Sequence, residues 1–181
     1  MSAHPPAELV GQRIRLLAVS DERLDAIVAA VRVSLPELEQ FMDWAVSHPT
    51  QPEDFADFVE ESRAGWENGT TYNYTVMDQV SGEVIGGCGL MRRVGPGAIE
   101  IGYWIRSDRA GTGLATEVAR VLTAACRELD DIHAVIIVHD AANKASGRVA
   151  EKVGYVEFDR VPVELTALGG SGIDVYRRLD L

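Results

Sequence analysis

The hydrophobic pattern of the N-terminal part of the chain changes from a strand to helices. Residues 12–19 are strand-like and place Ile14 and Leu16 on one face. Within residues 24–31 apolar side chains recur at i, i+3, i+4 and i+7, which predicts a helix that Ser20 caps. We interpret Pro36 as the start of a further helical segment, because proline is favoured at the first helical position.

The pattern then switches to a short period. Thr50 and Glu53 have capping-box spacing and predict another helix start. After it, residues 72–76, 83–94 and 98–105 are strand-like and are separated by turn signals, Ser-Gly and Gly-Pro-Gly. Three strands joined by such short turns predict an antiparallel meander.

The C-terminal part alternates helices and strands. Apolar spacing predicts helices over residues 114–129 and 143–153, with the β-branched strand 133–138 between them. Residues 154–165 and 172–181 predict two final strands. The chain is therefore expected to form a mixed α/β (α+β) domain with helices packed on a mostly antiparallel sheet.

Length and composition bound the organisation. A chain of 181 residues suits one domain, and we assign residues 1–8 to a flexible tail and residues 9–181 to that domain. Its net charge of −11 argues against a nucleic-acid partner and favours a basic or amine-bearing one. The chain shows neither a leader-like segment nor an apolar run long enough to span a bilayer, so we expect a cytoplasmic protein without a membrane partner.

Residues 109–117, Arg-Ala-Gly-Thr-Gly-Leu-Ala-Thr-Glu, place two glycines directly before a helical pattern. Without Cβ atoms, Gly111 and Gly113 let an anion approach the unpaired N–H groups of the helix start. A turn required only for backbone geometry is the alternative. A P-loop is excluded because no Gly-Lys-Ser/Thr follows, and a dinucleotide fingerprint is excluded because its third glycine is missing.

The run over residues 99–121 resembles motif A of the GNAT N-acetyltransferases, which is a strand, a pyrophosphate loop and a helix. It departs from the motif at Ala110, where the family has Gln or Arg and where this chain has Arg109 one residue earlier. Residues 143–157 and 34–45 are similar to segments of the ribosomal-protein (RimJ/RimL-like) branch of that family. The resemblance therefore covers most of the chain.

The resemblance implies a GNAT fold, with a twisted, mostly antiparallel sheet of about seven strands, helices on both faces and a splay between the fourth and fifth strands. It implies acetyl-CoA as cosubstrate, with the pyrophosphate on the backbone of the loop and the pantetheine arm pairing like an added strand. The implied cofactor-binding residues are Trp104, Ile105, Arg109, Ala110, Gly111, Thr112, Gly113, Leu114, Ala115, Asn143, Ser146 and Lys152. For Lys152, a solvated helix lysine is the alternative.

Two carboxylates compete for the role of general base in attack of an amine on the thioester. Glu100 is the leading candidate because it lies on the strand that would carry the cofactor, and Glu164 is the alternative that the resemblance implies. A surface ion pair with an arginine is the structural alternative for Glu100. Ser146 is the expected proton donor to the leaving thiolate, with Tyr155 as second choice.

Other chemical groups have simpler interpretations. The adjacent His139 and Asp140 fit an acid–base pair less well than an ordinary strand end. Trp44, Trp66 and Tyr72 fit core positions better than an acceptor pocket. The histidines and the two cysteines lack metal-ligand spacing, so we expect no metal.

The sequence leaves the acceptor open. The enzyme hypothesis is transfer of the acetyl group to a primary amine, either the N-terminus of a ribosomal or other protein or a small molecule such as an antibiotic, a polyamine or an amino acid. An α-amine is the easier nucleophile, because its pKa of about 8 lies well below the roughly 10.4 of lysine. A non-catalytic acyl-CoA-binding module is the competing hypothesis, and the resemblance also implies a homodimer.

Overall fold

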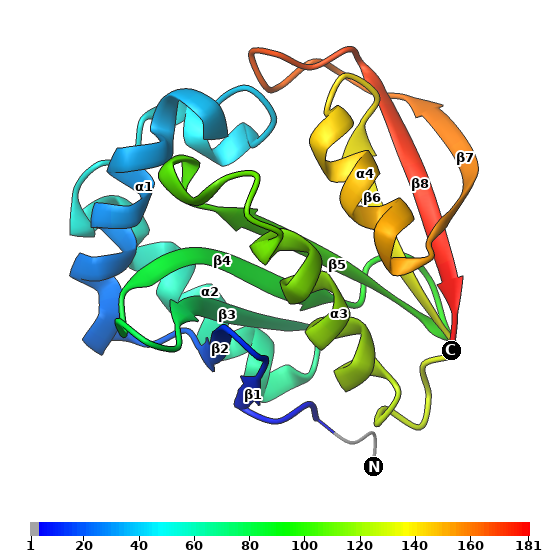
Figure 1. The fold of residues 1–181 in the computed structure, drawn as a ribbon, viewed down its shortest axis with the longest axis horizontal. Helices are drawn as coiled ribbons and strands as arrows, with labels where there is room; N and C mark the ends of the chain where they lie inside the picture. Colours follow the sequence, from blue (N-terminus) through cyan, green and yellow to red (C-terminus); the bar gives the residue numbers. More distant parts are fainter. Residues whose placement is uncertain (1–3) are drawn as a thin grey trace.

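A computed structural model describes residues 4–181, which form one sheet flanked by helices (Figure 1). The strands are β1 (Glu8–Val10), β2 (Ile14–Ala18), β3 (Thr71–Asp78), β4 (Val84–Met91), β5 (Ala98–Ile105), β6 (Ala134–Asp140), β7 (Val156–Pro162) and β8 (Ile173–Asp180). The α-helices are α1 (Leu24–Leu38), α2 (Ala56–Asn68), α3 (Leu114–Cys126) and α4 (Lys144–Val153). Short 3₁₀ helices are η1 (Asp21–Arg23), η2 (Asp43–Ser47), η3 (Pro52–Phe55) and η4 (Ser107–Arg109).

The sheet runs in the order β1-β2-β3-β4-β5-β6-β8-β7. Every neighbouring pair is antiparallel except β5 and β6, which are parallel. That parallel pairing joins only Ala98–Glu100 to Ala134–Ile136, and beyond it the two strands separate. The mixed, mostly antiparallel sheet and its splay between these two strands are confirmed.

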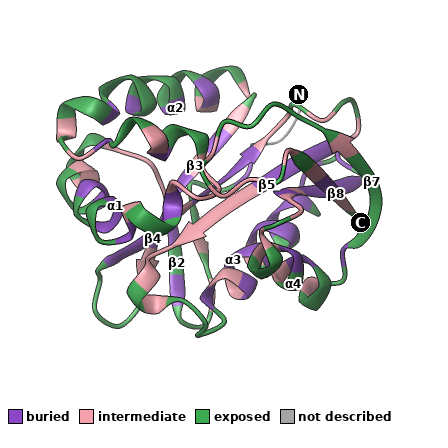
Figure 2. Cartoon of the chain, turned by 90° about the horizontal axis from the view of Figure 1, so that it is seen from above, coloured by how far each residue is buried: buried purple, intermediate pink, exposed green. Residues whose placement is uncertain are grey.

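Helices cover both faces of the sheet, as the resemblance implied. On one face α3 and α4 bury the main core, to which β5 contributes Ile99 and Ile101. On the other face α1 packs over Val84 of β4 in a second core. The outer half of β5 is only partly buried, as Figure 2 shows, because neither helical layer closes over the splay.

The first strand lies earlier than the sequence pattern indicated. Glu8 pairs with Leu17, so the sheet has eight strands and begins inside the segment assigned to a tail. The sequence pattern does not indicate this strand, because none of the three residues of Glu8–Val10 is buried and the segment has no buried face. The first three residues of the expected tail lie outside the described part of the chain.

The helix starts of the N-terminal half differ from the expectations. Pro36 lies inside α1 and does not begin a new helix. The helix tolerates this proline because it ends within one turn after it, so few backbone hydrogen bonds are lost. The capping box is shifted by one residue, from Thr50 and Glu53 to Gln51 and Asp54. Ser20 occupies the N-cap position of η1, but its hydroxyl makes no capping hydrogen bond.

Within residues 4–181 no helix has the length and apolar character needed to cross a membrane. Cys88 in β4 and Cys126 in α3 are both buried free thiols. Burial raises the pKa of each thiol, to about 12 for Cys126, so both stay protonated at neutral pH.

Candidate functional site: a glycine loop beside the splayed strands

The loop between β5 and α3 has the geometry of an anion cradle. Gly111 and Gly113 have φ of 75° and 85°, a region in which L side chains are strained. A Cβ at Gly111 would find no atom within 4 Å, so this side of the loop faces open space. Among the described residues, no backbone N–H from Gly111 to Thr116 donates to a protein acceptor, which leaves the helix start able to bind an anion.

Residues from outside the loop hold it in shape. Arg13 donates from Nη1 to the Thr112 carbonyl at 3.0 Å and from Nε to Glu117 at 2.9 Å. The other oxygen of Glu117 accepts the N–H groups of Gln12 and Arg13. Burial opposes ionisation of Glu117, but these hydrogen bonds outweigh it and lower the pKa of the carboxyl. The loop is thus anchored to the start of β2 by an ion pair that is charged at neutral pH.

The side chain of Arg109 is held on acidic neighbours beside the loop. Its Nη2 donates to Glu83 at 2.9 Å, and its Nη1 lies 3.8 Å from Asp78. Arg109 therefore has its main chain in the loop while its charge is largely neutralised by the β3–β4 turn.

The splay leaves one edge of β5 open. Gly86 and Gly87 of β4 pair with Ile105 and Trp104, but β6 pairs with β5 only as far as Glu100. The backbone of residues 101–105 therefore presents unpaired groups toward the gap, the arrangement that binds an extended ligand by strand addition.

The start of α4 faces β5 across the splay. Asn143 is the N-cap, and its Oδ1 accepts the Ser146 N–H at 3.1 Å. The hydroxyl of Tyr103 on β5 lies 3.1 Å from Ser146 Oγ. Burial raises the pKa of Tyr103 to about 12, so its hydroxyl remains protonated. These residues form a hydrogen-bonded chain that bridges the gap.

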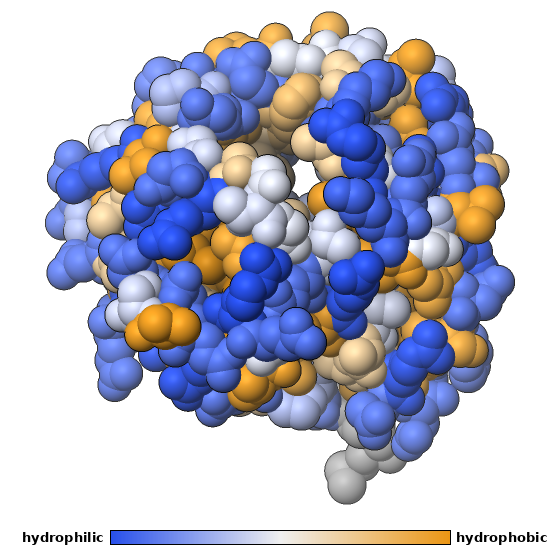
Figure 3. Space-filling model, viewed as in Figure 1, coloured by the Kyte–Doolittle hydropathy of each residue, from blue (hydrophilic) through white to orange (hydrophobic). Residues whose placement is uncertain are grey.

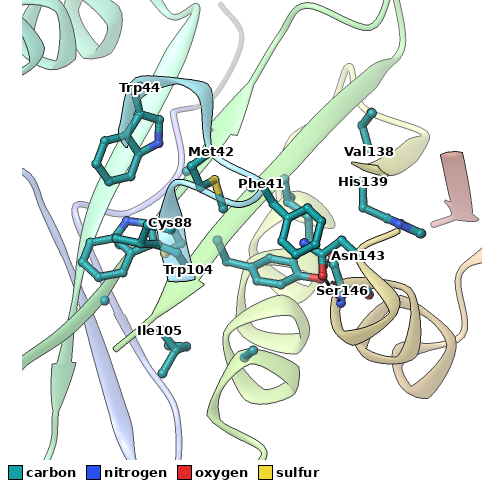
Figure 4. A pocket seen from close by; sticks show the side chains of 18 of the residues that line it. Phe41, Met42, Trp44, Cys88, Trp104, Ile105, Val138, His139, Asn143 and Ser146 are labelled. Atoms are coloured by element: carbon teal, nitrogen blue, oxygen red, sulfur yellow. Dashed lines mark hydrogen bonds between the residues drawn. The ribbon is translucent and has the colours of Figure 1, made fainter. Parts of the chain in front are cut away.

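A cavity of about 1330 Å³ connects the loop, the splay and the opposite face of the sheet. Figure 3 shows the molecule hollowed near its centre. In Figure 4, Trp44 and Trp104 lie on one side of the cavity, and Asn143 and Ser146 lie on the other. The rings of Trp44 and Trp104 are 6.3 Å apart. The cavity thus combines an aromatic wall with a polar one.

Most of the residues proposed from the sequence line this cavity. The sequence-derived residues that do so are Glu100, Trp104, Ile105, Arg109, Ala110, Gly111, Gly113, Leu114, Ala115, Asn143, Ser146, Lys152 and Glu164. Thr112 lies in the loop but not on the cavity wall, and its hydroxyl donates to the Arg109 carbonyl. The exposed Lys152 has no side-chain partner among the described residues.

Tyr155 is not brought to the cavity. It is buried in the main core, and its hydroxyl lies 2.6 Å from that of Thr123 in α3. Burial raises the pKa of the Tyr155 hydroxyl above its ordinary value. The geometry therefore favours Ser146 over Tyr155 as the hydroxyl that reaches a bound thioester.

The two carboxylates proposed as base have different surroundings. Glu100 is buried on β5 and forms a bidentate ion pair with Arg93, at 2.8 and 2.6 Å. Glu164 is exposed in the loop of residues 163–172 and has no ionic partner among the described residues. The arginine pair is the structural alternative that the sequence left open for Glu100.

The His139–Asp140 pair does not form an acid–base dyad. His139 Nε2 accepts from Arg177 at 3.0 Å, and burial lowers the pKa of the imidazole. Asp140 instead accepts from the backbone N–H and hydroxyl of Ser171. Both residues organise the end of β6.

The aromatic residues divide between cavity and core. Trp44 lines the cavity, whereas Trp66 and Tyr72 pack against each other in the interior with ring centroids 5.0 Å apart. Within the described part of the chain, no cluster of three or more His, Cys, Asp or Glu side chains has the arrangement of a metal site.

Among the cavity groups that sequence reasoning missed are Arg93, Tyr103 and Asp174. Tyr103 shares the buried face of β5 with Ile99 and Ile101, so its spacing indicated only a core residue. Asp174 lies on β8, next to β6 in the sheet but more than thirty positions away in sequence, and no local pattern links it to the loop.

The family described as "Acetyltransferase (GNAT) domain" matches residues 13–156. No curated protein matches the chain.

Solved structures share the fold at low sequence identity. A RimL ribosomal L7/L12 alpha-N-protein acetyltransferase in complex with coenzyme A is 21% identical, with a TM-score of 0.84 over 95% of this chain and 96% of its own. RimJ of Mycobacterium smegmatis in complex with CoA-disulfide is 21% identical, with a TM-score of 0.85 over 98% and 90%. The microcin C7 self-immunity acetyltransferase MccE in complex with acetyl-CoA and AMP is 16% identical, with a TM-score of 0.84 over 94% and 93%. The family match spans most of the chain and includes the glycine loop, so the chain belongs to the GNAT acetyltransferase family.

Proposed function

We propose that this acetyltransferase moves the acetyl group of acetyl-CoA to the N-terminal amine of a protein, as a member of the ribosomal-protein branch of its family. The observation that carries the proposal is the glycine loop, whose unpaired N–H groups open onto the same cavity as the splayed edge of β5. Similarity to RimL and RimJ supports the choice of branch.

The residues present fit the parts of acetyl-CoA. No atom lies within 4 Å of a Cβ built at Gly111, so a diphosphate can approach the loop, and the helix start supplies N–H donors and partial positive charge. The free edge of residues 101–105 suits the amides of the pantetheine arm, and Trp104 and Ile105 lie at its end. Asn143 flanks the same gap, and Lys152 supplies a free cation at its outer side.

Proton transfer follows from the same geometry. Attack of a neutral amine on the thioester requires a base, and departure of the thiolate requires a proton. Ser146, hydrogen-bonded to Tyr103, is the donor that reaches the gap. Glu100 and Glu164 line the cavity together with other carboxylates, so we expect the base to be a carboxylate of the cavity wall.

A small-molecule amine is the second candidate acceptor. The aromatic wall formed by Trp44 and Trp104 would accommodate an apolar group, and the similar MccE structure contains AMP beside acetyl-CoA. The acidic chain, with a net charge of −11, favours basic acceptors in either case.

A panel assay distinguishes these candidates. Thiol release from acetyl-CoA is measured with short peptides bearing N-terminal serine or alanine, with spermidine, with kanamycin and with free amino acids. Preferential turnover of the peptides supports the proposal. Preferential turnover of a small amine would show that the acceptor is a small molecule and not a protein N-terminus. Tight acetyl-CoA binding without turnover of any amine favours the non-catalytic module.

The same proposal includes a cytoplasmic homodimer. Support for a partner surface comes from the edge strand β7, which exposes Val156 and Phe158. The cytoplasm is the compartment in which ribosomal acceptors are made. Light scattering on the purified protein tests the dimer, and a monomer at all concentrations would exclude it.

A further inference from the structure

The cavity wall contains seven carboxylates, and their partners decide which of them is available to an acceptor. These residues are Glu37, Asp43, Asp54, Glu100, Asp140, Glu164 and Asp174. Four are engaged: Asp43 and Asp54 accept backbone N–H groups, Asp140 holds Ser171, and Glu100 is bound by Arg93. A carboxylate so engaged already has its oxygen atoms occupied, so it is less available to bind the ammonium group of an acceptor.

Three carboxylates remain without a hydrogen bond or ion pair among residues 4–181. Glu37 and Glu164 are exposed to solvent, whereas Asp174 is half-buried. Glu164 belongs to an irregular loop, but Asp174 belongs to β8, a strand paired on both sides. Of these three carboxylates, Asp174 is therefore the one that is partly shielded from solvent and held in place by a strand.

The sheet register places Asp174 at the catalytic end of the molecule. Asp174 pairs with Asp140, the last residue of β6, and from there the chain leads directly to Asn143 and Ser146. Alternation along β8 puts Asp174 on the same face as Tyr176, opposite to the buried Val175. Asp174 thus lines the cavity at the end of β6, close in the chain fold to the start of α4.

We propose that Asp174 binds the acceptor's ammonium group and takes its proton. This role rests on the proposed transfer to an amine and assigns a residue that the sequence did not indicate. The acceptor R–NH₃⁺ passes one proton to the Asp174 carboxylate, which releases it to water. The amine lone pair then forms the C–N bond, the C–S bond breaks, and the second N–H proton reaches the thiolate by way of Ser146.

The electrostatic surroundings agree with this assignment. Burial raises the pKa of Asp174, and the charges of Asp140 and Glu100 raise it further, whereas His139 and Arg93 act in the opposite direction. On its own strand, Tyr176 also faces it. A raised pKa makes the carboxylate a stronger base, and its activity is lost as the pH falls through that value.

Asp174→Asn tests the proposal, because the variant keeps the size of the side chain and removes only its basicity. Acetyl-CoA affinity is measured by calorimetry, and kcat/KM is measured against pH with the amine of the panel that the wild type acetylates fastest. We expect unchanged acetyl-CoA affinity and a fall in kcat/KM of about 100-fold. The part of the acidic limb that reports ionisation of Asp174 should disappear, which leaves only the limb set by the acceptor amine at its own pKa of about 8.

Three further variants make the result specific. Asp130→Asn changes an exposed aspartate outside the cavity and should behave as wild type. Glu164→Gln and Glu100→Gln should each retain the part of the acidic limb that Asp174→Asn loses. Wild-type kcat/KM in Asp174→Asn, or loss of that part of the limb in Glu164→Gln or Glu100→Gln instead, would overturn the role of Asp174. Failure of the wild type itself to acetylate any amine would overturn the proposed function.

Discussion

At the scale of single residues, a hydrogen bond across the splay positions the expected proton donor. Tyr103 comes from β5 and Ser146 from the first turn of α4, and their oxygen atoms are 3.1 Å apart. Because burial raises the pKa of Tyr103 to about 12, the phenol stays protonated throughout the range in which the enzyme would work. It can therefore relay a proton to the serine, and it does not titrate near neutral pH.

Tyr103→Phe should lower kcat about fivefold, the effect of one lost neutral hydrogen bond. Ser146→Ala should lower it more, because the donor itself is removed. The measurement is steady-state thiol release with acetyl-CoA affinity determined in parallel. Equal kcat for Tyr103→Phe and wild type would remove the tyrosine from the proton path.

At the scale of elements, the start of α3 combines backbone conformation with access. Two glycines of positive φ bring the chain into the helix, and the space beside Gly111 is open. Gly82 in the β3–β4 turn also has positive φ and open surroundings, but it lies outside the cavity. A substitution at Gly82 therefore measures backbone strain alone, without an effect on ligand binding.

Gly111→Ala and Gly82→Ala form a matched pair. Each should cost about 1–2 kcal/mol of unfolding free energy, since both place a Cβ in the left-handed region. Only Gly111→Ala should also weaken acetyl-CoA binding, by about tenfold or more, because its Cβ occupies the space proposed for the diphosphate. Denaturant unfolding and calorimetry measure the two effects, and equal acetyl-CoA affinity in both variants contradicts the loop assignment.

At the scale of the whole molecule, the β7–β8 loop (residues 163–172) joins the two halves around the cavity. Its Leu168 and Gly169 donate backbone N–H groups to the carbonyls of Glu39 and Gln40, just after α1. Both the loop and this end of α1 contribute to the cavity wall. The connection therefore borders the cavity away from the glycine loop, on the side where we expect the acceptor.

Gly169→Ala should loosen this connection, because a Cβ there would lie 3.0 Å from the Gln40 carbonyl oxygen, which is backbone. We expect the acceptor KM to rise several-fold while the acetyl-CoA KM in the same variant stays constant. Initial-rate kinetics with each substrate varied in turn measure both values. A rise in the acetyl-CoA KM alone would place the loop on the cofactor side.

The sequence by itself determined the elements and the chemistry that is local in the chain. The meander, the C-terminal strands and the glycine loop with its helix are encoded by spacing and turn residues within short windows. The loop was identifiable for the same reason, because Gly111 and Gly113 act through their own backbone. The short strand β1 was not, since it buries no residue and its only signal is its pairing with β2.

Tertiary structure alone decided which charged and polar groups share the cavity. Whether Glu100 is free or paired depends on Arg93, which a turn brings back to β5, and no periodicity encodes that contact. Tyr155 and Tyr103 carry the same hydroxyl, yet packing buries the first against α3 and places the second beside Ser146. Asp174 reaches the site only because β8 inserts between β6 and β7. Contacts of this kind join residues distant in sequence, and the free energy that selects them comes from packing of the whole domain.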